Sequence, residues 1–287
     1  MTETQKTKGL VTEDLTEYYK RVDEEGRLAS GTGPLEFSRT LDILKRYLPP
    51  PPATIGDAGG GAGAYAFPLA RKGYAVHLLD PVPRHIEQAR QASSRQPDHP
   101  LASSKVGDAR ALDWPDNSMD ALLFMGPLYH LPEREDRIKA LREASRVTRQ
   151  GGRIFAAVIS RFASLIDGIF RRFLEDPAFV PIVEKDLLDG QHRNPTGNPA
   201  YFTSTFFHHP DDIVAEIDEA GLTLEKLLAV ESLGGLISDF EELWQDTKRR
   251  KMLLRFTRAI EDEPSLLGTS SHIIAIAKNG KKNRRRG

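Results

Sequence analysis

One glycine-rich loop between two apolar segments limits the fold of this chain more than any other feature. The stretch TIGDAGGGAGAYAFPLARKGYAVHLLDP, residues 54–81, places five glycines within eight residues and ends with a second apolar run that closes on Asp80. A strand that turns sharply into a helix leaves backbone N–H groups unpaired, and glycine lets a ligand approach them without meeting a Cβ atom. The loop therefore predicts a strand, a tight turn and a helix arranged around a ligand.

The alternation of apolar runs with helical segments predicts the fold class. Between residues 53 and 160, runs rich in Val, Ile and Leu alternate with helical patterns, which is typical of a doubly wound α/β sheet with helices on both faces. We expect strands at ATIGDA, AVHLLD, SKVGDA, DALLFMG and RIFAAVIS. We expect helices near residues 63–73, 83–94 and 134–149, the last capped by Gly151 and Gly152. Pro68 conflicts with the first of these helices unless it begins later or bends.

The flanking segments divide the chain into four parts. Residues 1–52 contain two expected helices, over 12–28 and 35–48, and residues 53–160 form the core. Residues 161–210 break the alternation with an apolar-rich insertion, which we expect to cap the edge of the sheet. Residues 211–287 complete the core with a helix near 211–220, a strand over 225–232, one long helix near 238–261 and a strand over 271–278, followed by a basic tail.

Composition excludes several classes of partner. The 287 residues carry a net charge of −1, so no overall field favours nucleic acid or anionic lipid. The chain has no cysteine, which removes disulfides and thiolate chemistry and fits a cytoplasmic protein. No apolar run is long enough to cross a membrane, and the first ten residues lack the pattern of an export signal. We therefore expect a soluble, unexported protein.

Carboxylates near the loop narrow the choice of ligand. Asp80, at the end of the second strand, is placed to accept hydrogen bonds from ribose hydroxyls, which indicates a nucleoside-containing cofactor. A nicotinamide-dependent oxidoreductase would look the same here, because Gly59, Gly61 and Ala64 satisfy its G-x-G-x-x-[GA] pattern. Asp57, two residues before Gly59, would crowd a pyrophosphate but suits a cationic ligand.

Two further segments continue this pattern. Asp108 follows the third strand, where a carboxylate can accept from an adenine amino group, although it can equally cap a helix. The fourth strand runs into GPLYHLP, a polar and aromatic cluster at the carboxyl end of the sheet, where open α/β folds place their reacting groups.

Taken together, these segments resemble the motifs of class I S-adenosylmethionine-dependent methyltransferases over nearly the whole chain. DAGGGAG resembles their first motif, LLDP the second, GDARAL the third, and MDALLFMGPLYHL with REASRVTRQGGRI those of the fourth and fifth strands. The resemblance implies a Rossmann-like, seven-stranded sheet in the order 3-2-1-4-5-7-6 with the seventh strand antiparallel. It also implies that residues 1–52 form a lid, with Tyr19 and Arg27, and next Glu36 and Arg39, as candidates to close over the cofactor.

The resemblance also assigns roles within the site. Asp57 and the backbone of Gly59, Gly61 and Gly63 would hold the methionine end of S-adenosyl-L-methionine. Asp80 would bind the ribose, and Asp108 with the Ala109 N–H would bind adenine. The expected cofactor-binding residues are then Asp57, Gly59, Gly61, Gly63, Asp80, Asp108, Ala109, Arg27 and Gly126.

Methyl transfer requires alignment and a route for a released proton more than covalent help from the protein. His130 is the leading candidate for the base because imidazole titrates near neutral pH, although it can equally be a packed side chain. Tyr129 and Tyr19 are the other catalytic candidates, with Asp167, His208 and His209 as secondary ones. We expect no metal, because adjacent histidines do not face one ion as easily as an i, i+4 pair.

The expected acceptor is a small molecule. Gly126 and Leu128 depart from the Asn/Asp-Pro-Pro-aromatic pattern of methyltransferases that act on amino groups of DNA or protein. Apolar residues of the insertion can instead line a pocket for a partly apolar acceptor or form the core of the cap itself, and Trp244 of the late helix can belong to either. The insertion residues are Phe162, Leu165, Ile166, Ile169, Phe170, Phe173, Tyr201, Phe202, Phe206 and Phe207. The sequence leaves open an oxygen, nitrogen or carbon nucleophile, a homodimer, an NAD(P)-dependent oxidoreductase and a non-catalytic cofactor-binding protein.

Overall fold

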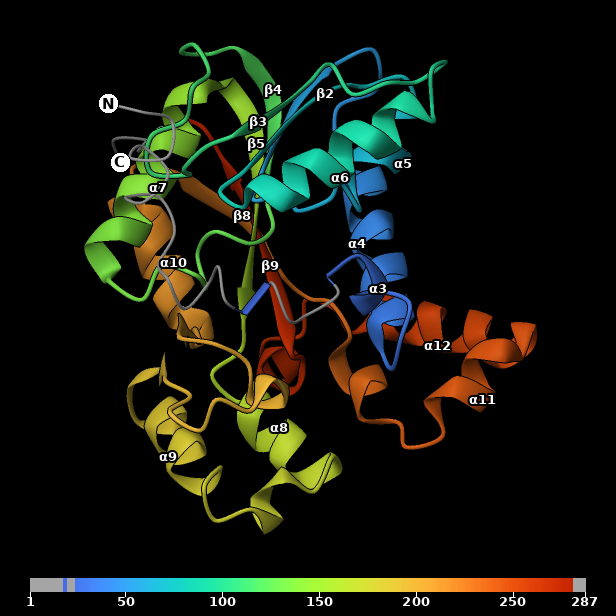
Figure 1. Cartoon of the computed structure of the whole chain (residues 1–287), viewed down its shortest axis with the longest axis vertical. Helices are drawn as coiled ribbons and strands as arrows, with labels where there is room; N and C mark the ends of the chain where they lie inside the picture. Colours follow the sequence, from blue (N-terminus) through green and yellow to red (C-terminus); the bar gives the residue numbers. More distant parts are fainter. Residues whose placement is uncertain (1–17, 20–23, 281–287) are drawn as a thin grey trace, which may run out of the picture.

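A seven-stranded sheet organises the protein. The computed structural model describes residues 18–19 and 24–280, and its main sheet has the order β3-β2-β1-β4-β5-β9-β8 (Figure 1). The strands are β1 Thr54–Ala58, β2 Ala75–Asp80, β3 Ser103–Val106, β4 Met119–Phe124, β5 Thr148–Ile159, β8 Thr223–Ala229 and β9 His272–Lys278. The first five pair in parallel, and β9 runs antiparallel to both β5 and β8. The predicted Rossmann-like order 3-2-1-4-5-7-6, with an antiparallel seventh strand, is confirmed.

Helices cover both faces of this sheet (Figure 1). One face packs on α4 Gly33–Tyr47, α5 Ala66–Ala70 and α6 Pro83–Ser94, and the other on α7 Arg134–Val147 and α10 Pro210–Glu219. Ile43, Leu69 and Ile86 are fully or almost fully buried on the first face, and Leu141 and Ile213 on the second. The strands are therefore apolar on both sides, which explains why they are continuous Val/Ile/Leu runs.

Two helix predictions are wrong at their ends. The helix expected over 63–73 spans only Ala66–Ala70, because Gly63 still has a φ of +98°. Pro68 then lies in the first turn, where a missing N–H costs nothing. Gly151 and Gly152 do not cap α7, which ends at Val147; both lie in β5, and Gly151 has a φ of +80° beside an irregularity in the β4–β5 register.

The long helix expected over 238–261 is two helices. Residues Phe240–Gln245 form α11 and Thr247–Ala259 form α12. Asp246 separates them in an extended conformation, and its carboxylate accepts from the N–H groups of Lys248 and Arg249. This is an N-terminal cap, which begins a new helix where periodicity alone predicts continuation.

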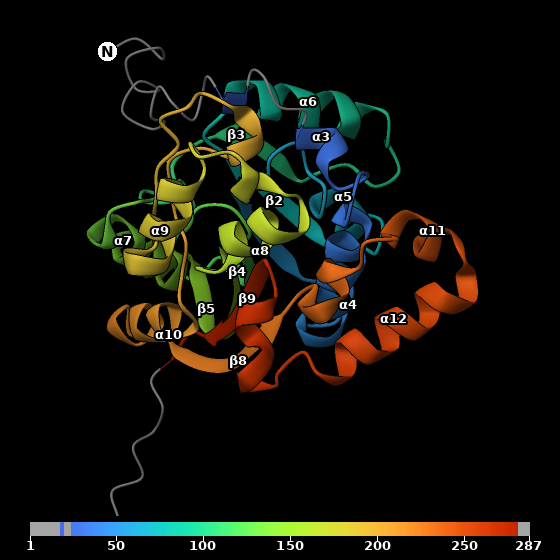
Figure 2. The same cartoon turned by 90° about the horizontal axis from the view of Figure 1, so that it is seen from below.

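The insertion after β5 is largely helical. It contains α8 Ala163–Phe170, α9 Val180–Asp189 and the two-stranded sheet of β6 Gln191–His192 with β7 Thr205–Phe206. It continues from the carboxyl end of β5, below the sheet in the view of Figure 1 and over its end in Figure 2. Short 3-10 helices occur within the insertion at Phe173–Glu175 and Pro199–Tyr201, and later in the chain at Ser232–Leu236 and Pro264–Thr269.

At the N-terminal side, α3 Glu24–Arg27 precedes α4. Most of the helix predicted over 12–28, and the basic tail from residue 281, lie outside the described residues. The division of the chain into lid, core, cap and C-terminal part stays a prediction.

Arg137 of α7 connects the core to the insertion. Its guanidinium is almost fully buried, bonds Glu216 of α10 at 2.8 Å and lies 3.6 Å above the Phe206 ring. It also donates to the carbonyls of Leu131 and Pro132 at 2.9 and 2.7 Å. One side chain therefore fixes the loop after β4, the helix α10 and the insertion.

We expect Arg137→Ala to lower the free energy of unfolding by about 3–5 kcal/mol, because it leaves a buried carboxylate without its main partner. Arg134→Ala is the matched control on the same helix: its partner Glu219 and Arg134 itself are 45% and 46% exposed, so the cost should be about 1 kcal/mol or less. Urea denaturation measures both. Equal losses in the two variants would contradict the connecting role.

Candidate active site

The glycine loop takes the sharp turn that the sequence predicts. Gly59 has a φ of +74°, and a Cβ atom there would lie 2.7 Å from the Pro127 ring. The N–H groups of Gly59 and Gly60 both donate to the Leu79 carbonyl. These contacts hold the loop against the ends of β2 and β4, so a side chain at residue 59 would push the loop away from its support.

A cavity of about 330 Å³ lies over this loop. Of the nine expected cofactor-binding residues and the three leading catalytic candidates, all except Asp57 line it: Tyr19, Arg27, Gly59, Gly61, Gly63, Asp80, Asp108, Ala109, Gly126, Tyr129 and His130. They come from the N-terminal segment, the loop after β1, the end of β2 and the loops after β3 and β4. The parallel strands bring them to one edge of the sheet, as an open α/β fold requires.

Asp57 lies beneath the loop. It is completely buried, and within the described residues neither carboxylate oxygen has a hydrogen-bond partner. A Cβ atom at Gly60 would lie 2.6 Å from the carboxylate, so only a glycine backbone separates it from the cavity side of the loop. Burial, and secondarily the charge of Asp80, raise the pKa of Asp57 to about 7.

Asp80, the last residue of β2, is hydrogen-bonded to the glycine loop. Its Oδ2 accepts from the Gly61 N–H at 2.9 Å, and its Oδ1 contacts the Val82 N–H and His85 Nδ1 at 2.9 and 3.0 Å. A carboxylate offers about four lone-pair positions, so it retains capacity for another donor. Sequence analysis missed His85. This residue follows Asp80 by five positions, and the helix α6 brings its ring back to the Asp80 carboxylate.

Asp108 is less open than the sequence predicts. Its two oxygens accept from the backbone N–H and the guanidinium of Arg110, with the closest contact at 2.7 Å. Arg110 also donates to Asp136 at 2.7 Å. An adenine amino group at this carboxylate must therefore share it with Arg110.

His130 and Tyr19 form a pair across the cavity. The Tyr19 hydroxyl lies 2.8 Å from His130 Nε2, and within the described residues the buried Nδ1 has no hydrogen-bond partner. Burial, and secondarily the charge of His85, lower the pKa of His130 to about 3. The expectation that this imidazole titrates near neutral pH is therefore wrong for this conformation. Tyr129 donates its hydroxyl to the Met125 carbonyl at 3.0 Å.

The two arginines proposed for the lid behave differently. Arg27 lines the cavity and makes a two-pronged ion pair with Glu36, at 2.7 and 2.9 Å. Arg39 does not line it: the side chain is buried and bonds Glu261 and Asp42. The prediction for Arg39 as a cofactor contact is wrong, because its position on α4 points it to the helix's packed side.

The secondary histidine candidates are structural. His208 is buried against Glu216 at 3.2 Å, and His209 caps the start of α10. Neither histidine lines the cavity over the glycine loop or the one beside it.

A second, larger cavity of about 1,070 Å³ adjoins the first and shares Tyr19, Arg27 and Tyr129 with it. Some apolar residues of the insertion line it as predicted, namely Ile166, Phe170, Phe173, Tyr201, Phe202 and Phe207. Phe162, Leu165, Ile169 and Phe206 do not, nor does Trp244 of α11. Asp167, Glu231 and His272 add charge to its wall, and sequence analysis missed the last two because they are 41 residues apart.

In the described part of the chain, no helix combines the length and apolarity needed to cross a membrane.

Comparison with known proteins agrees with this geometry. Residues 56–156 match the family model of a methyltransferase domain. The ubiquinone biosynthesis O-methyltransferase of Methylocella silvestris is 36% identical over 118 residues, which are 40% of this chain and 44% of that protein. The chain spans about half the length of the curated relatives it matches.

Solved structures share the fold at low sequence identity. A SAM-dependent methyltransferase from Methanosarcina mazei superposes with a TM-score of 0.56 at 19% identity, over 84% of this chain and 98% of that one. The geranyl diphosphate C-methyltransferase of Streptomyces coelicolor, solved with S-adenosyl-L-homocysteine, gives 0.52 at 14% identity, over 85% and 80%. The domain match identifies residues 56–156 as a methyltransferase domain, and the strand order agrees with the fold of these solved methyltransferases.

Proposed function

We propose that the protein transfers a methyl group from S-adenosyl-L-methionine to a small, partly apolar acceptor. The observation that carries this proposal is the buried carboxylate of Asp57 under the glycine loop, which has no hydrogen-bond partner among the residues that the structure describes. S-adenosyl-L-methionine brings an ammonium and a sulfonium to this loop, and either positive charge would stabilise ionised Asp57. The pyrophosphate of a nicotinamide dinucleotide would instead add negative charge above it.

The remaining cofactor contacts follow from the cavity. Asp80 has lone-pair capacity left for a ribose hydroxyl beyond its three present contacts. Asp108 and the Ala109 backbone line the part of the cavity next to Arg110, where adenine would lie. Gly126 lies against the Gly59 carbonyl, so the loop after β4 approaches the cofactor without a side chain between them.

When bound, S-adenosyl-L-methionine supplies a methyl group on a sulfonium that is already a good leaving group. The work left to the chain is to align the acceptor, exclude water and accept or disperse the acceptor's proton. Tyr19, Arg27 and Tyr129 line both cavities and separate the cofactor from the acceptor. The larger cavity, with its aromatic wall from the insertion, is the acceptor site.

The names of the relatives support a small acceptor. One is named for ubiquinone biosynthesis and one for geranyl diphosphate. The acceptor cavity of about 1,070 Å³ is large enough for a small molecule such as those named by these relatives.

Calorimetry with the purified full-length chain tests this proposal. S-adenosyl-L-methionine and S-adenosyl-L-homocysteine should bind with micromolar dissociation constants, or roughly −8 kcal/mol, and NAD⁺ or NADP⁺ should bind far more weakly. Tight binding of a dinucleotide without binding of either sulfur ligand would reject the proposal.

His130 should act by positioning Tyr19 rather than as a base. We expect His130→Ala to lower kcat by a few-fold to about ten-fold, the worth of one neutral hydrogen bond. A base would contribute about a hundred- to ten-thousand-fold. With a pKa of about 3, His130 stays neutral, so it should give the pH–rate profile no acid limb near pH 6.

Tyr19→Phe is the matched variant, since it removes the same hydrogen bond from the other side. Similar losses in both variants support a positioning pair. A loss above a hundred-fold in His130→Ala alone, together with disappearance of an acid limb near pH 6, would make His130 the base.

A further inference from the structure

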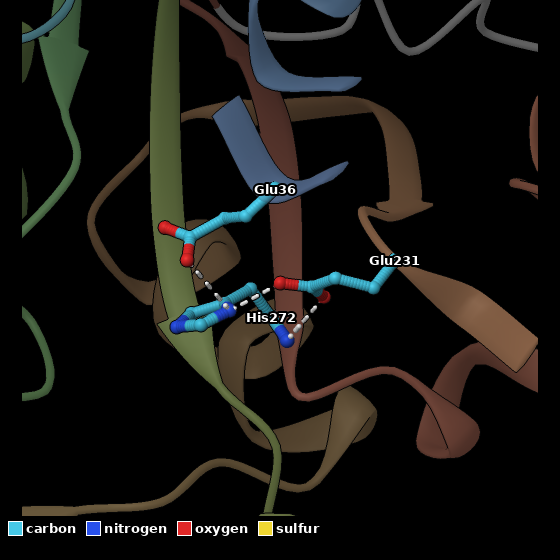
Figure 3. A group of neighbouring side chains, drawn as sticks. All are labelled: Glu36, Glu231 and His272. Atoms are coloured by element: carbon cyan, nitrogen blue, oxygen red, sulfur yellow. Dashed lines mark hydrogen bonds and ion pairs between the residues drawn. The ribbon is translucent and has the colours of Figure 1, made fainter. Parts of the chain in front are cut away.

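Three charged side chains meet on the wall of the acceptor cavity (Figure 3). Glu36 comes from α4, Glu231 directly precedes the 3-10 helix Ser232–Leu236, and His272 is the first residue of β9. All three line the acceptor cavity and none lines the cofactor cavity. The role proposed for the glycine loop does not account for them.

Glu231 fixes the orientation of the His272 ring. Its Oε1 lies 2.6 Å from His272 Nδ1, and its Oε2 accepts from the backbone N–H of the same residue at 3.0 Å. The Ser270 hydroxyl also donates to Oε2 at 2.8 Å, and the Glu231 side chain is only 4% exposed. The carboxylate therefore has little freedom, and the imidazole it holds has one defined direction.

The other ring nitrogen of His272 faces away from both carboxylates. Figure 3 shows both ion-pair contacts of the ring meeting at Nδ1, while Nε2 points to the opposite side. In the described part of the chain no hydrogen bond to Nε2 is present, and the side chain is 23% exposed. Because His272 lines the acceptor cavity, Nε2 is the atom it can offer to a bound molecule.

The charges around His272 keep it protonated. Burial alone would lower its pKa, but the charges of Glu36 and Glu231 raise it to about 9 against an opposing contribution from Arg27. Asp167 of α8 also faces it and is paired with Arg171 at 3.2 Å. At neutral pH, Nε2 therefore carries a proton that it can donate in a hydrogen bond. The positive charges of His272 and Arg27 balance the negative charges of Glu36 and Glu231.

We propose that the Nε2–H of His272 binds the ionised oxygen of the acceptor, so that the acceptor is an acidic hydroxyl compound such as a phenol or an enol. This inference rests on the proposed function. The acceptor's O–H bond breaks as it binds, the proton leaves to solvent, and His272 keeps its own proton. Methylation then removes the oxygen's negative charge, so the product loses its charged hydrogen bond and is released more easily.

A metal ion fits the cluster less well. Arg27 occupies both oxygens of Glu36, and His272 offers these carboxylates a protonated nitrogen. A divalent ion would have to displace Arg27 and the imidazole proton together, since only a neutral imidazole binds metal.

The full-length chain with 4-nitrophenol as probe tests the proposal. The probe is largely ionised at about pH 8, and its ionised form absorbs visible light, so difference spectra report which form binds. We expect the phenolate to bind, and His272→Gln to weaken it about ten- to a hundred-fold, the worth of a charged hydrogen bond. In the parent chain, affinity should fall as pH rises through about 9, where His272 loses its proton.

Matched controls separate this role from a structural one. His99→Gln, at an exposed position outside both cavities, should bind the phenolate like the parent. 4-Nitroanisole, which cannot ionise, should bind the parent and His272→Gln equally. Glu231→Gln should move the alkaline fall to lower pH, and it decides the question if His272→Gln does not fold.

Binding of S-adenosyl-L-homocysteine distinguishes failure of the proposed function from failure of the role of His272. His272→Gln should bind it like the parent, whereas failure of the parent to bind it would reject the proposed function itself. Three results would overturn the role of His272: equal phenolate affinity in His272→Gln, parent affinity for 4-nitroanisole equal to that for the phenolate, or stoichiometric Zn²⁺ binding that His272→Gln abolishes.

Discussion

The carboxylate of Asp57, buried beneath a loop of glycine backbone with no partner in the described structure, is the constraint on which the site depends. An isolated buried carboxylate is costly, so its pKa rises until it is half protonated near neutral pH. Gly60 packs directly on it, and Gly59 packs on Pro127 of the loop after β4. A titratable carboxylate without a partner in the described structure therefore lies under a backbone segment made of glycines.

The rest of the fold arranges two cavities around this position. The parallel strands bring the glycine loop, Asp80 and Asp108 to one edge, where the cofactor cavity forms. The insertion after β5 supplies the aromatic side of the acceptor cavity, and Arg137 fixes that insertion to α7 and α10. The Glu36–Glu231–His272 cluster lines the same cavity, so apolar packing and one defined donor are combined there.

Local patterns in the sequence were sufficient for the strands of the parallel core, and the family resemblance supplied their order. Most residues that line the cavity over the glycine loop could be named because they lie at the ends of neighbouring strands; their contacts with a cofactor stay a prediction. Three kinds of feature were beyond reach. Asp246 divides a helix by capping, which periodicity does not reveal. Arg110 reaches back to Asp108, and His272 meets Glu231 and Glu36 only because β9 inserts beside β5. The low pKa of His130 also depends on burial, which residue type does not report.

Proton linkage to cofactor binding tests the role of Asp57 most directly. Below about pH 7 the free protein holds Asp57 mainly protonated; a cationic ligand at the loop lowers that pKa, so binding should release a proton. Calorimetry of S-adenosyl-L-methionine binding at about pH 6.5, in buffers of different ionisation enthalpy, should show release of up to about three quarters of a proton, declining above pH 8 and absent in Asp57→Asn. Equal proton release in the parent and in Asp57→Asn, or no release at any pH, would contradict the account.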